Sequence, residues 1–379
     1  MSDVQTPIYL DHNATTPVLP AALEAMLPYL RKHFGNPSSG HLFGRRARRA
    51  VDRARGQVAA LLGCSPSEII FTSGGTEANN LAIVGVARAR PSRRTIVSSV
   101  IEHPATARPC QWLADQGHTL HLLDVDHQGR IVTDQARQAI DEDTALVTVM
   151  HSNNETGVLQ PIEELVELAR ERGAVVHTDA AQSVGKIPVK VDRLQVDLLS
   201  LAGHKLYAPK GIGALYVRRG TPLEPLLLGA GHEGGLRPGT ENVASIVALG
   251  VACEHAAART EEVSQKMSDL RDLLWTRLQA AIPDIALNGH PSLRLPNTLN
   301  VRFPGVTGDA ILARAPEVAA STGSACAAGG PSASATILAM GVPAQQALGS
   351  LRLSLGRDST EAEIEIAARA LISAYREET

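Results

Sequence analysis

The sequence predicts an α/β protein built on a mostly parallel sheet. Short apolar segments alternate with longer segments of helical periodicity over roughly the first two thirds of the chain, a pattern typical of strands joined by crossover helices. Polar residues follow directly after several of the apolar segments, as they do where ligands bind at the carboxyl ends of parallel strands. Beyond residue 258 the alternation fades, so we expect a second, smaller α+β domain there.

The length of 379 residues allows two or three domains. We expect a large domain over residues 15–258 and a small domain formed by residues 1–14 together with residues 259–379. A long amphipathic helix predicted over residues 260–282 marks the boundary, and residues 297–303 alternate as a half-exposed strand does. The N-terminal residues are expected to complete the small domain.

The composition excludes several classes of protein. A net charge of −3 argues against nucleic acid or an anionic membrane as the main partner. No apolar run approaches the ~18 residues of a membrane span, and the first residues do not have the pattern of a signal peptide. The four cysteines are far apart and not at metal-ligand spacing, so we expect a cytoplasmic protein without a disulfide framework. The arginine-rich segment 44–55 is interpreted as a solvated helix face.

The first predicted elements are a short apolar strand at residues 8–10 and two helices. Asn, Thr and Pro at residues 13–17 end the strand in a turn, and Pro20 opens a helix over residues 21–33. A second helix, residues 44–62, is expected to end at Gly63, because glycine commonly closes helices in the left-handed conformation.

The remaining strands of the large domain are predicted from apolar runs bounded by turn residues. They cover residues 68–72, 95–100, 120–125, 145–150, 174–176, 196–201 and 211–217. Helices are predicted from Thr76, before Gly173, and from Val243 to about residue 258, the last followed by the separate helix over residues 260–282.

Two of these strands end in groups of opposite charge. Asp179 follows the strand at 174–176, and Lys205 follows the strand at 196–201, so both are expected at one cleft beyond the sheet. An amine that forms a Schiff base with an aldehyde and an acid that keeps a pyridine nitrogen protonated are the two groups that a pyridoxal phosphate (PLP) enzyme needs. A buried structural ion pair is the alternative.

Other strand ends add groups to the same edge. Residues 73–75, Ser-Gly-Gly, precede the helix that begins near Thr76, and free N–H groups at such a helix start suit a phosphate. An N-capped helix after a tight turn explains this pattern equally well. His103 follows the strand at 95–100, where it either stacks on a ring and moves protons or is structural. The polar residues 151–157 supply amide donors.

Three later features complete the candidate site. Residues 229–242 form a breaker-rich segment that is a candidate binding loop or interface. Cys326 has only Gly, Ala and Ser as near neighbours, which favours a mobile, accessible and reactive thiol over a buried structural cysteine. Arg352 lies on an apolar strand, where it either clamps a substrate carboxylate or forms a surface ion pair.

A set of longer motifs extends from Tyr9 to about Glu363: YLDHNATTP, FTSGGTEANN, IEHPA, NNETGVLQPI, HTDAAQSVGK, GHKLYAPKGIGALY, GLRPGTEN, STGSACAAGG and RLSLGR. In content and order they resemble the cysteine desulfurases of the NifS/IscS type, within the class V, fold-type I PLP enzymes. The resemblance implies a large domain with a mostly parallel, seven-stranded sheet and a smaller α+β domain that carries the catalytic cysteine loop.

The resemblance also implies a role for each candidate residue around PLP. Lys205 would bind the cofactor covalently, Asp179 would pair with its pyridine nitrogen, and His103 would stack on its ring. Gln182 and Asn154 would make further contacts near the phenolic oxygen of the cofactor. Gly75, Thr76 and His204 of the same chain would hold the phosphate, together with Thr240 of the partner subunit. No metal site is implied.

For the reaction, the resemblance implies removal of sulfur from L-cysteine to give L-alanine. Arg352, with Asn154, would bind the substrate carboxylate, and Cys326 would take the sulfur as a persulfide. A sulfur-acceptor protein would then receive it, for iron–sulfur cluster assembly or for nucleic-acid sulfur modification. The enzyme would be a homodimer without membrane or direct nucleic-acid contact.

Two alternative classes remain beside the desulfurase. One is a selenocysteine lyase or another class V PLP enzyme. The other is a non-catalytic scaffold, which is expected to have lost Lys205 or Asp179, although both are present.

The chain departs from the family pattern at three places. Ala202 replaces a serine that would donate to the phosphate, alanines and glycines at 327–330 replace hydroxyl residues, and Gly234 replaces a residue that is often basic. The last two departures indicate a specialised branch, such as nucleic-acid sulfur modification.

Overall fold

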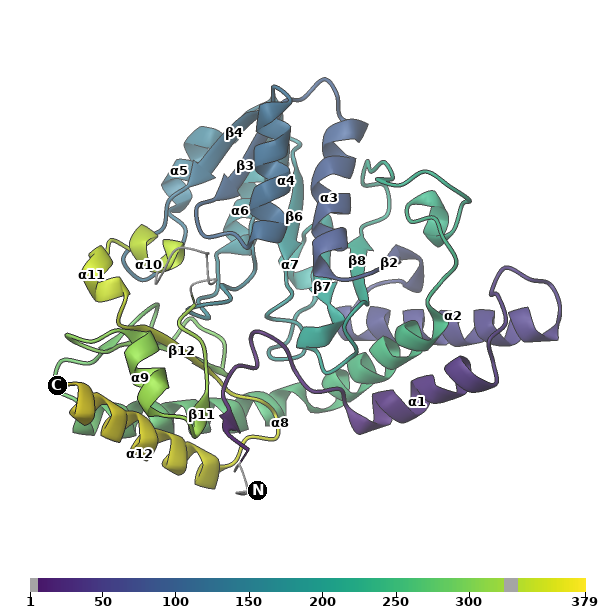
Figure 1. The fold of residues 1–379 in the computed structure, drawn as a ribbon. Coiled ribbons are helices and arrows are strands. Elements are labelled where there is room, and N and C mark those ends of the chain that lie inside the picture. The colour runs from purple at the N-terminus through teal and green to yellow at the C-terminus, as the bar shows by residue number, and fades with distance from the viewer. Residues whose placement is uncertain (1–5, 324–332) are drawn as a thin grey trace.

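A seven-stranded sheet forms the centre of the larger part of the computed structural model, which describes residues 6–323 and 333–379 (Figure 1). Its strands lie in the order β2 (Ile69–Thr72), β8 (Gly213–Val217), β7 (Leu198–Ala202), β6 (Val175–Asp179), β5 (Thr144–Thr148), β3 (Thr95–Ser99) and β4 (Thr119–Leu123). Within this sheet β8 runs antiparallel to both of its neighbours, and the other strands are parallel. The predicted mostly parallel sheet is confirmed.

Helices cover both faces of this sheet because its central strands are apolar on both sides. On β6, Val175 contributes to a core beneath α3 (Gly75–Ala89) and α4 (Pro104–Asp115), whereas Val176 contributes to the core on the opposite face. That opposite core includes residues of α2 (Leu42–Leu62), α5 (Thr133–Ala139), α6 (Ile162–Glu171) and α7 (Val191–Leu194). Because helices cover the faces of such a sheet, a ligand binds at the carboxyl ends of the strands.

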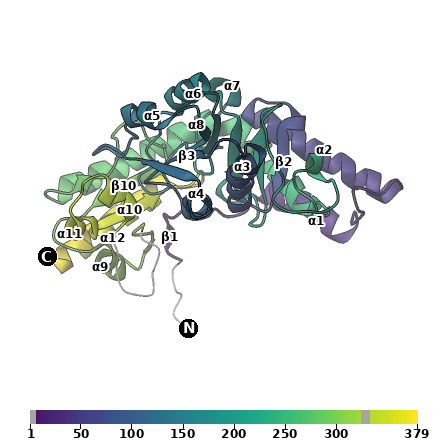
Figure 2. The same ribbon diagram turned by 90° about the horizontal axis from the view of Figure 1, so that it is seen from above.

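A second core lies beside the first and is built around two smaller sheets. One sheet has the antiparallel order β12 (Ser350–Ser354), β10 (Thr298–Arg302) and β9 (Ala286–Leu287), and the other pairs β1 (Ile8–Tyr9) with β11 (Val318–Ala319). The helices α9 (Gly308–Arg314) and α12 (Glu361–Glu378) cover them, while the short helices α10 (Ala335–Ala339) and α11 (Ala344–Ala347) lie nearer the first core (Figures 1 and 2). Leu10 is buried in this second core, so N-terminal residues contribute to it.

The prediction of a half-exposed strand at residues 297–303 is wrong. β10 is the middle strand of its sheet, and Thr298 and Asn300 are buried, although they alternate with apolar neighbours. Their polar groups bond to other parts of the protein rather than to water: Asn300 donates to the carbonyl of Glu155 at 3.0 Å, and Thr298 accepts from Asn13 at 2.9 Å. The alternation of polar and apolar residues along β10 therefore reflects buried polar contacts and not a face exposed to solvent.

The predicted pair of helices over residues 243–258 and 260–282 is a single helix. α8 (Val243–Ala281) runs for 39 residues without a break, since no Gly or Pro interrupts it near residue 259. Its first half packs with α1 (Pro20–Arg31) and α2, and its second half, through Leu274 and Leu278, belongs to the second core. We propose that the two cores are two domains, with α8 shared between them instead of divided at residue 258.

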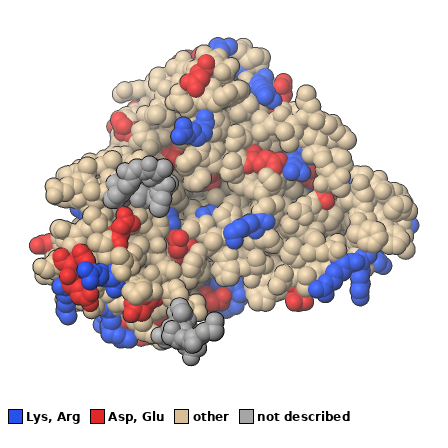
Figure 3. Space-filling view, in the orientation of Figure 1, with Lys and Arg blue, Asp and Glu red and all other residues tan. Residues whose placement is uncertain are grey.

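The arginine-rich segment lies on α2, where Ala47, Val51 and Ala54 are buried and the exposed side chains include Arg45 and Arg49. This confirms the interpretation as a solvated helix face. Figure 3 shows positive side chains gathered near the ends of α1 and α2, while charges of both signs are scattered over the rest of that face. Within residues 6–323 and 333–379, no helix combines the length and apolarity needed to cross a bilayer.

Candidate active site

A cavity of about 390 Å³ lies beyond the carboxyl ends of the parallel strands, where residues from both cores meet. Nine of the predicted site residues line it: Gly75, Thr76, His103, Asn154, Asp179, Gln182, His204, Lys205 and Arg352. They come from six separate places in the chain, so the parallel sheet and the β12 strand together assemble the site.

Asp179 is the last residue of β6 and is held by two donors. Its Oδ1 accepts from the backbone N–H of Ala181 at 2.9 Å, and its Oδ2 accepts from Nδ2 of Asn79 at 2.7 Å. These bonds fix the orientation of the carboxylate, and each oxygen keeps a further lone pair for an N–H donor in the cavity. Oδ1 of Asn79 is buried without a hydrogen-bond partner among the described residues, which marks this wall as built for a polar ligand.

Lys205 follows β7 in the 3₁₀ turn Gly203–Lys205. Its Nζ donates to the carbonyl oxygens of Asn13 and Ala14. Desolvation, with a further contribution from Arg352, lowers the pKa of Lys205 to about 8, although Asp11 and Asp179 oppose the shift. About a tenth of this amine is therefore unprotonated at pH 7, and the unprotonated amine is the form that attacks a carbonyl.

His103 is the N-cap residue of α4, and its Nδ1 accepts from the backbone N–H of Ala105 at 3.1 Å. The neutral ring then carries its proton on Nε2. Desolvation lowers the pKa of His103, with a smaller contribution from Lys205 in the same direction and an opposing one from Asp179. The preceding residue, Glu102, anchors this corner by accepting from Ser99 Oγ at 2.6 Å.

The turn before α3 leaves backbone N–H donors free, as an anion cradle requires. Gly74, the N-cap, has φ 153° and provides no side-chain cap, and the backbone N–H groups of Gly75, Thr76 and Glu77 have no acceptor in the described part of the chain. A Cβ at Gly213 would lie 2.7 Å from the Gly74 backbone, so β8 approaches the turn more closely than another residue would allow.

The side of this cradle carries the departure from the family pattern. The Ala202 methyl group would lie 3.3 Å from a Cβ at Gly75, so an apolar contact occupies the place of the expected hydroxyl. Ser200 does not replace it, because its buried Oγ bonds to His177 Nε2 at 2.9 Å. His204 also faces the cavity and bonds through Nδ1 to Thr15 Oγ1 at 3.2 Å.

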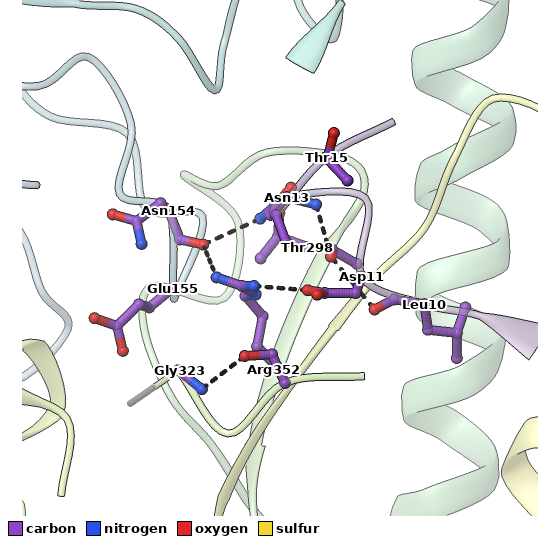
Figure 4. A network of polar contacts seen from close by, with 12 residues as sticks. Leu10, Asp11, Asn13, Thr15, Asn154, Glu155, Thr298, Gly323 and Arg352 are labelled. Carbon is purple, nitrogen blue, oxygen red and sulfur yellow. Dashed lines mark hydrogen bonds and ion pairs between the residues drawn. The ribbon is translucent and has the colours of Figure 1, made fainter. Parts of the chain in front are cut away.

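Arg352 lies in the middle of β12 and is buried (Figure 4). Its Nη2 pairs with Asp11 Oδ1 at 2.7 Å, and its Nη1 donates to the carbonyl oxygen of Asn154 at 3.1 Å. Its Nε is buried without a hydrogen-bond partner among the described residues. A guanidinium has five N–H donors, so the three that these bonds leave over suit a carboxylate in the cavity.

Two predicted residues are not placed in the cavity. Thr240 is exposed and contributes to a separate hollow of about 300 Å³, together with residues 29–37 at the end of α1. Cys326 lies outside the described residues. The residues flanking its segment can be placed: Ser321 exchanges backbone hydrogen bonds with Arg352, and Ser334 Oγ donates to Glu155 at 2.5 Å.

The remaining cysteines are poor candidates for a nucleophile. Cys64, Cys110 and Cys253 are free thiols, and none of them lines the cavity. Burial raises the pKa of Cys64 and of Cys110 to about 12 and that of Cys253 still further. All three are therefore protonated and weakly reactive at neutral pH.

Sequence reasoning missed the residues that hold the site residues in place. They are Asn13, Asn79 and Lys186, which bond to cavity residues, and Glu102 and Glu155, which adjoin the cavity residues His103 and Asn154 in the sequence. A weak signal existed, since each lies inside a polar motif quoted above, but no spacing in the sequence connects Asn13 with Lys186. Their contact joins residues 173 positions apart.

Comparison with known proteins agrees with this geometry. The model of the class-V aminotransferase family matches residues 8–366. "Cysteine desulfurase 2" of Trichormus variabilis is 49% identical over 360 residues, which cover 94% of this chain and 90% of that protein.

Two solved structures show the same architecture. A "NifS-like protein" has a TM-score of 0.91 at 35% identity and covers 97% of this chain and 99% of its own. "SspA in complex with cysteine" has a TM-score of 0.83 at 38% identity, with 92% and 98% covered. The chain therefore belongs to the class-V aminotransferase family and, within it, to the cysteine desulfurases of the NifS type.

Proposed function

We propose that this protein is a PLP-dependent cysteine desulfurase that converts L-cysteine to L-alanine and stores the sulfur as a persulfide on Cys326. The observation that carries the proposal is the convergence of Lys205, Asp179 and Arg352 on one cavity. A covalent anchor, a partner for a ring nitrogen and a carboxylate clamp are the groups that an amino-acid-transforming PLP enzyme requires. A solved relative is described as a complex with cysteine, which supports the substrate.

The residues present fit the cofactor. The uncapped N–H groups at the start of α3 suit its phosphate, the oriented carboxylate of Asp179 suits its pyridinium N–H, and the partly unprotonated Lys205 suits its aldehyde. Gln182, His103, Asn154 and His204 would complete the contacts. When bound, PLP supplies an electron sink that makes the Cα proton of an amino acid acidic.

The protein's own groups then bind the substrate and handle its protons. The free N–H donors of Arg352 bind the substrate carboxylate and so fix the position of the Cα–H bond. Lys205, whose pKa is lowered to about 8 in the cofactor-free protein, is placed to take the Cα proton and return it. His103 presents Nε2–H to the cavity as a second proton donor.

Sulfur transfer balances without an external oxidant. The Cys326 thiolate attacks the sulfur of the substrate, an S–S bond forms, and the Cβ–S bond breaks with its electron pair left on carbon. Protonation of that carbon gives alanine, and Cys326 keeps one added sulfur. Both ends of the segment that carries Cys326 support this role, since Ser321 pairs with Arg352 and Ser334 bonds to Glu155 beside Asn154.

We also propose a homodimer in which Thr240 of the partner subunit reaches the phosphate. Support comes from the position of Thr240, which is exposed and outside its own chain's cavity. Exposed apolar side chains lie in the neighbouring segments, including Phe34 at 74% and Leu228 at 93% exposure. Surfaces of this kind mark protein–protein contacts.

The acceptor of the sulfur is proposed by class. A sulfur-acceptor protein of iron–sulfur cluster assembly or of nucleic-acid sulfur modification would take the persulfide sulfur. The Ala-Gly composition at 327–330 and Gly234 favour a specialised acceptor. A cytoplasmic location without membrane or direct nucleic-acid binding stays a prediction.

Intact-protein and peptide mass spectrometry after addition of L-cysteine tests the function. The holoenzyme is expected to gain one sulfur on Cys326 and to release alanine, whereas Cys326→Ala gains none and Lys205→Ala releases no alanine. Cys253→Ala is the matched control and keeps the wild-type result. Full sulfur release by Cys326→Ala would contradict the proposal and favour a lyase that does not use this thiol.

A further inference from the structure

Lys186 is a buried amine to which the reaction above gives no task. It lies between the strand ends that carry Asp179 and Lys205, and it is 6% exposed. Its Nζ donates to Asn13 Oδ1 and to Gln182 Oε1, both at 2.9 Å. Within residues 6–323 and 333–379, no carboxylate forms an ion pair with it. A buried amine without a counter-ion is costly to keep, so a purely structural reason is hard to find.

The contacts with Lys186 and with the Asn13 carbonyl together orient the Gln182 amide. An amine that faces two oxygens donates hydrogens to both, whether it carries two protons or three. Oε1 of Gln182 must therefore face Lys186, and the NH₂ group must face the other way. There Nε2 donates one hydrogen to the carbonyl oxygen of Asn13 at 3.0 Å, and the second hydrogen remains for the cavity that Gln182 lines.

Asn13 holds the opposite side of this arrangement. Its Oδ1 accepts from Lys186 and from Asn297 Nδ2 at 3.0 Å, and its Nδ2 donates to the carbonyl of Asn154 at 3.2 Å and to Thr298 Oγ1 at 2.9 Å (Figure 4). Both ends of this amide are thus fixed by groups of the second core and of the cavity rim. Lys186 is supported from a rigid neighbour and not from a movable side chain.

We propose that Lys186 is a positioning residue that keeps the amide N–H of Gln182 directed at the phenolic oxygen of the bound cofactor. This inference rests on the proposed function. A donor on that oxygen stabilises the unprotonated form of the cofactor's chromophore and so holds the pH midpoint of its visible absorption band down. Without Lys186, Oε1 of Gln182 loses its partner, and only the hydrogen bond from Nε2 to the Asn13 carbonyl still opposes a turn of the amide oxygen toward the cavity.

The test uses the holoenzyme of Lys186→Met and follows its visible absorption band from pH 6 to pH 10. The midpoint is expected to rise by about half a pH unit or more, and PLP is expected to dissociate about fivefold faster. Lys190→Met is the matched control, because Lys190 also donates to two carbonyl oxygens, those of Ala60 and Leu61, but on an exposed surface. It should leave both quantities at the wild-type value.

A double-mutant cycle with Gln182→Met separates positioning from the charge of Lys186. If Lys186 acts through Gln182, K186M adds no shift in the Gln182→Met background. The inference is overturned if K186M shifts the pH midpoint equally in the wild-type and Gln182→Met proteins, or if K186M leaves the midpoint unchanged. In either case the presence of the visible absorption band still supports the proposed function. A wild-type protein without a visible band would instead contradict the proposed function, and this inference with it. K186L provides a second apolar variant should K186M fold poorly.

Discussion

At the scale of single residues, the site depends on groups whose protonation is set by their surroundings. Two donors fix the orientation of the Asp179 carboxylate, whereas desolvation and Arg352 lower the pKa of Lys205 to about 8. The surroundings thus hold the first group in place and make it easier for the second to lose its proton.

The pKa of Lys205 predicts how fast the cofactor-free protein takes up PLP. Only the unprotonated amine attacks the aldehyde, so the rate is expected to rise with pH and to level off above about 8. Because the positive charge of Arg352 lowers this pKa, Arg352→Gln should move the midpoint to higher pH. Stopped-flow absorbance measures the rate, and Arg130→Gln, at a residue that does not line the cavity, is the control. A midpoint that stays or falls in Arg352→Gln would contradict the electrostatic explanation.

The sequence was sufficient to predict the residues that chemistry demands but not those that support them. Asp179 and Lys205 each follow an apolar strand, and the rule that strand ends meet at one edge brought them together. Asn13 and Lys186 could not be paired in this way, because a buried hydrogen bond between distant residues leaves no periodic trace in either segment.

At the scale of elements, the segment 229–242 shows how a loop rich in glycine is fixed in place. Glu233 has a φ of 49° and a buried carboxylate that accepts from Arg55 at 2.6 and 2.7 Å and from the Phe71 N–H at 2.8 Å. This pair ties the loop to α2 and β2. The segment that leads to Thr240 therefore begins at a rigid point and not at a free end.

Glu233→Gln is expected to lower the free energy of unfolding by about 3–5 kcal/mol, because it leaves the partly buried Arg55 without its counter-ion. Urea denaturation followed by circular dichroism measures this. Glu163→Gln breaks the exposed pair with Arg193 and serves as the control, with a loss under about 1 kcal/mol. Equal decreases in the free energy of unfolding in the two variants would show that the Arg55–Glu233 pair stabilises the fold no more than an exposed ion pair does.

The elements themselves were predictable where apolar runs are bounded by turn residues. The predicted strands of the large sheet coincide with β2 to β8 to within a few residues, because each run is short and, except in the edge strand β4, buried on both sides. The errors occur where that logic fails. β10 has polar side chains that bond inside the protein, and α8 continues across a change of core that its residue pattern alone does not reveal.

At the scale of the whole molecule, buried histidines make stability depend on pH. His177 in β6 bonds to Thr148 Oγ1 at 2.8 Å and to Ser200 Oγ at 2.9 Å inside the sheet, and desolvation lowers its pKa to about 3. His151 is similarly buried, and desolvation lowers its pKa to about 4. Both are neutral in the folded protein at any pH at which it functions.

These shifts predict loss of stability in acid. As pH falls below about 6.5, His177 becomes protonated in the unfolded chain but stays neutral in the folded protein. The free energy of unfolding therefore falls, with a limiting slope of about 1.4 kcal/mol per pH unit for this residue. Between pH 6.5 and 4.5 this amounts to about 2.3 kcal/mol, because the unfolded histidine is already half protonated at pH 6.5. His177→Gln is expected to reduce the slope of urea-derived stability against pH, whereas H121Q, on the exposed side of β4, should not. An unchanged slope in His177→Gln would contradict this assignment.

The unbroken course of α8 limits how the gene can change. Each residue of an α-helix turns the chain by about 100°, so one residue inserted near position 259 would rotate everything attached beyond it by that angle. Arg352 would then swing out of register with Lys205, although neither had been altered. Insertions and deletions among relatives should therefore spare the middle of this helix and collect in the surface connections.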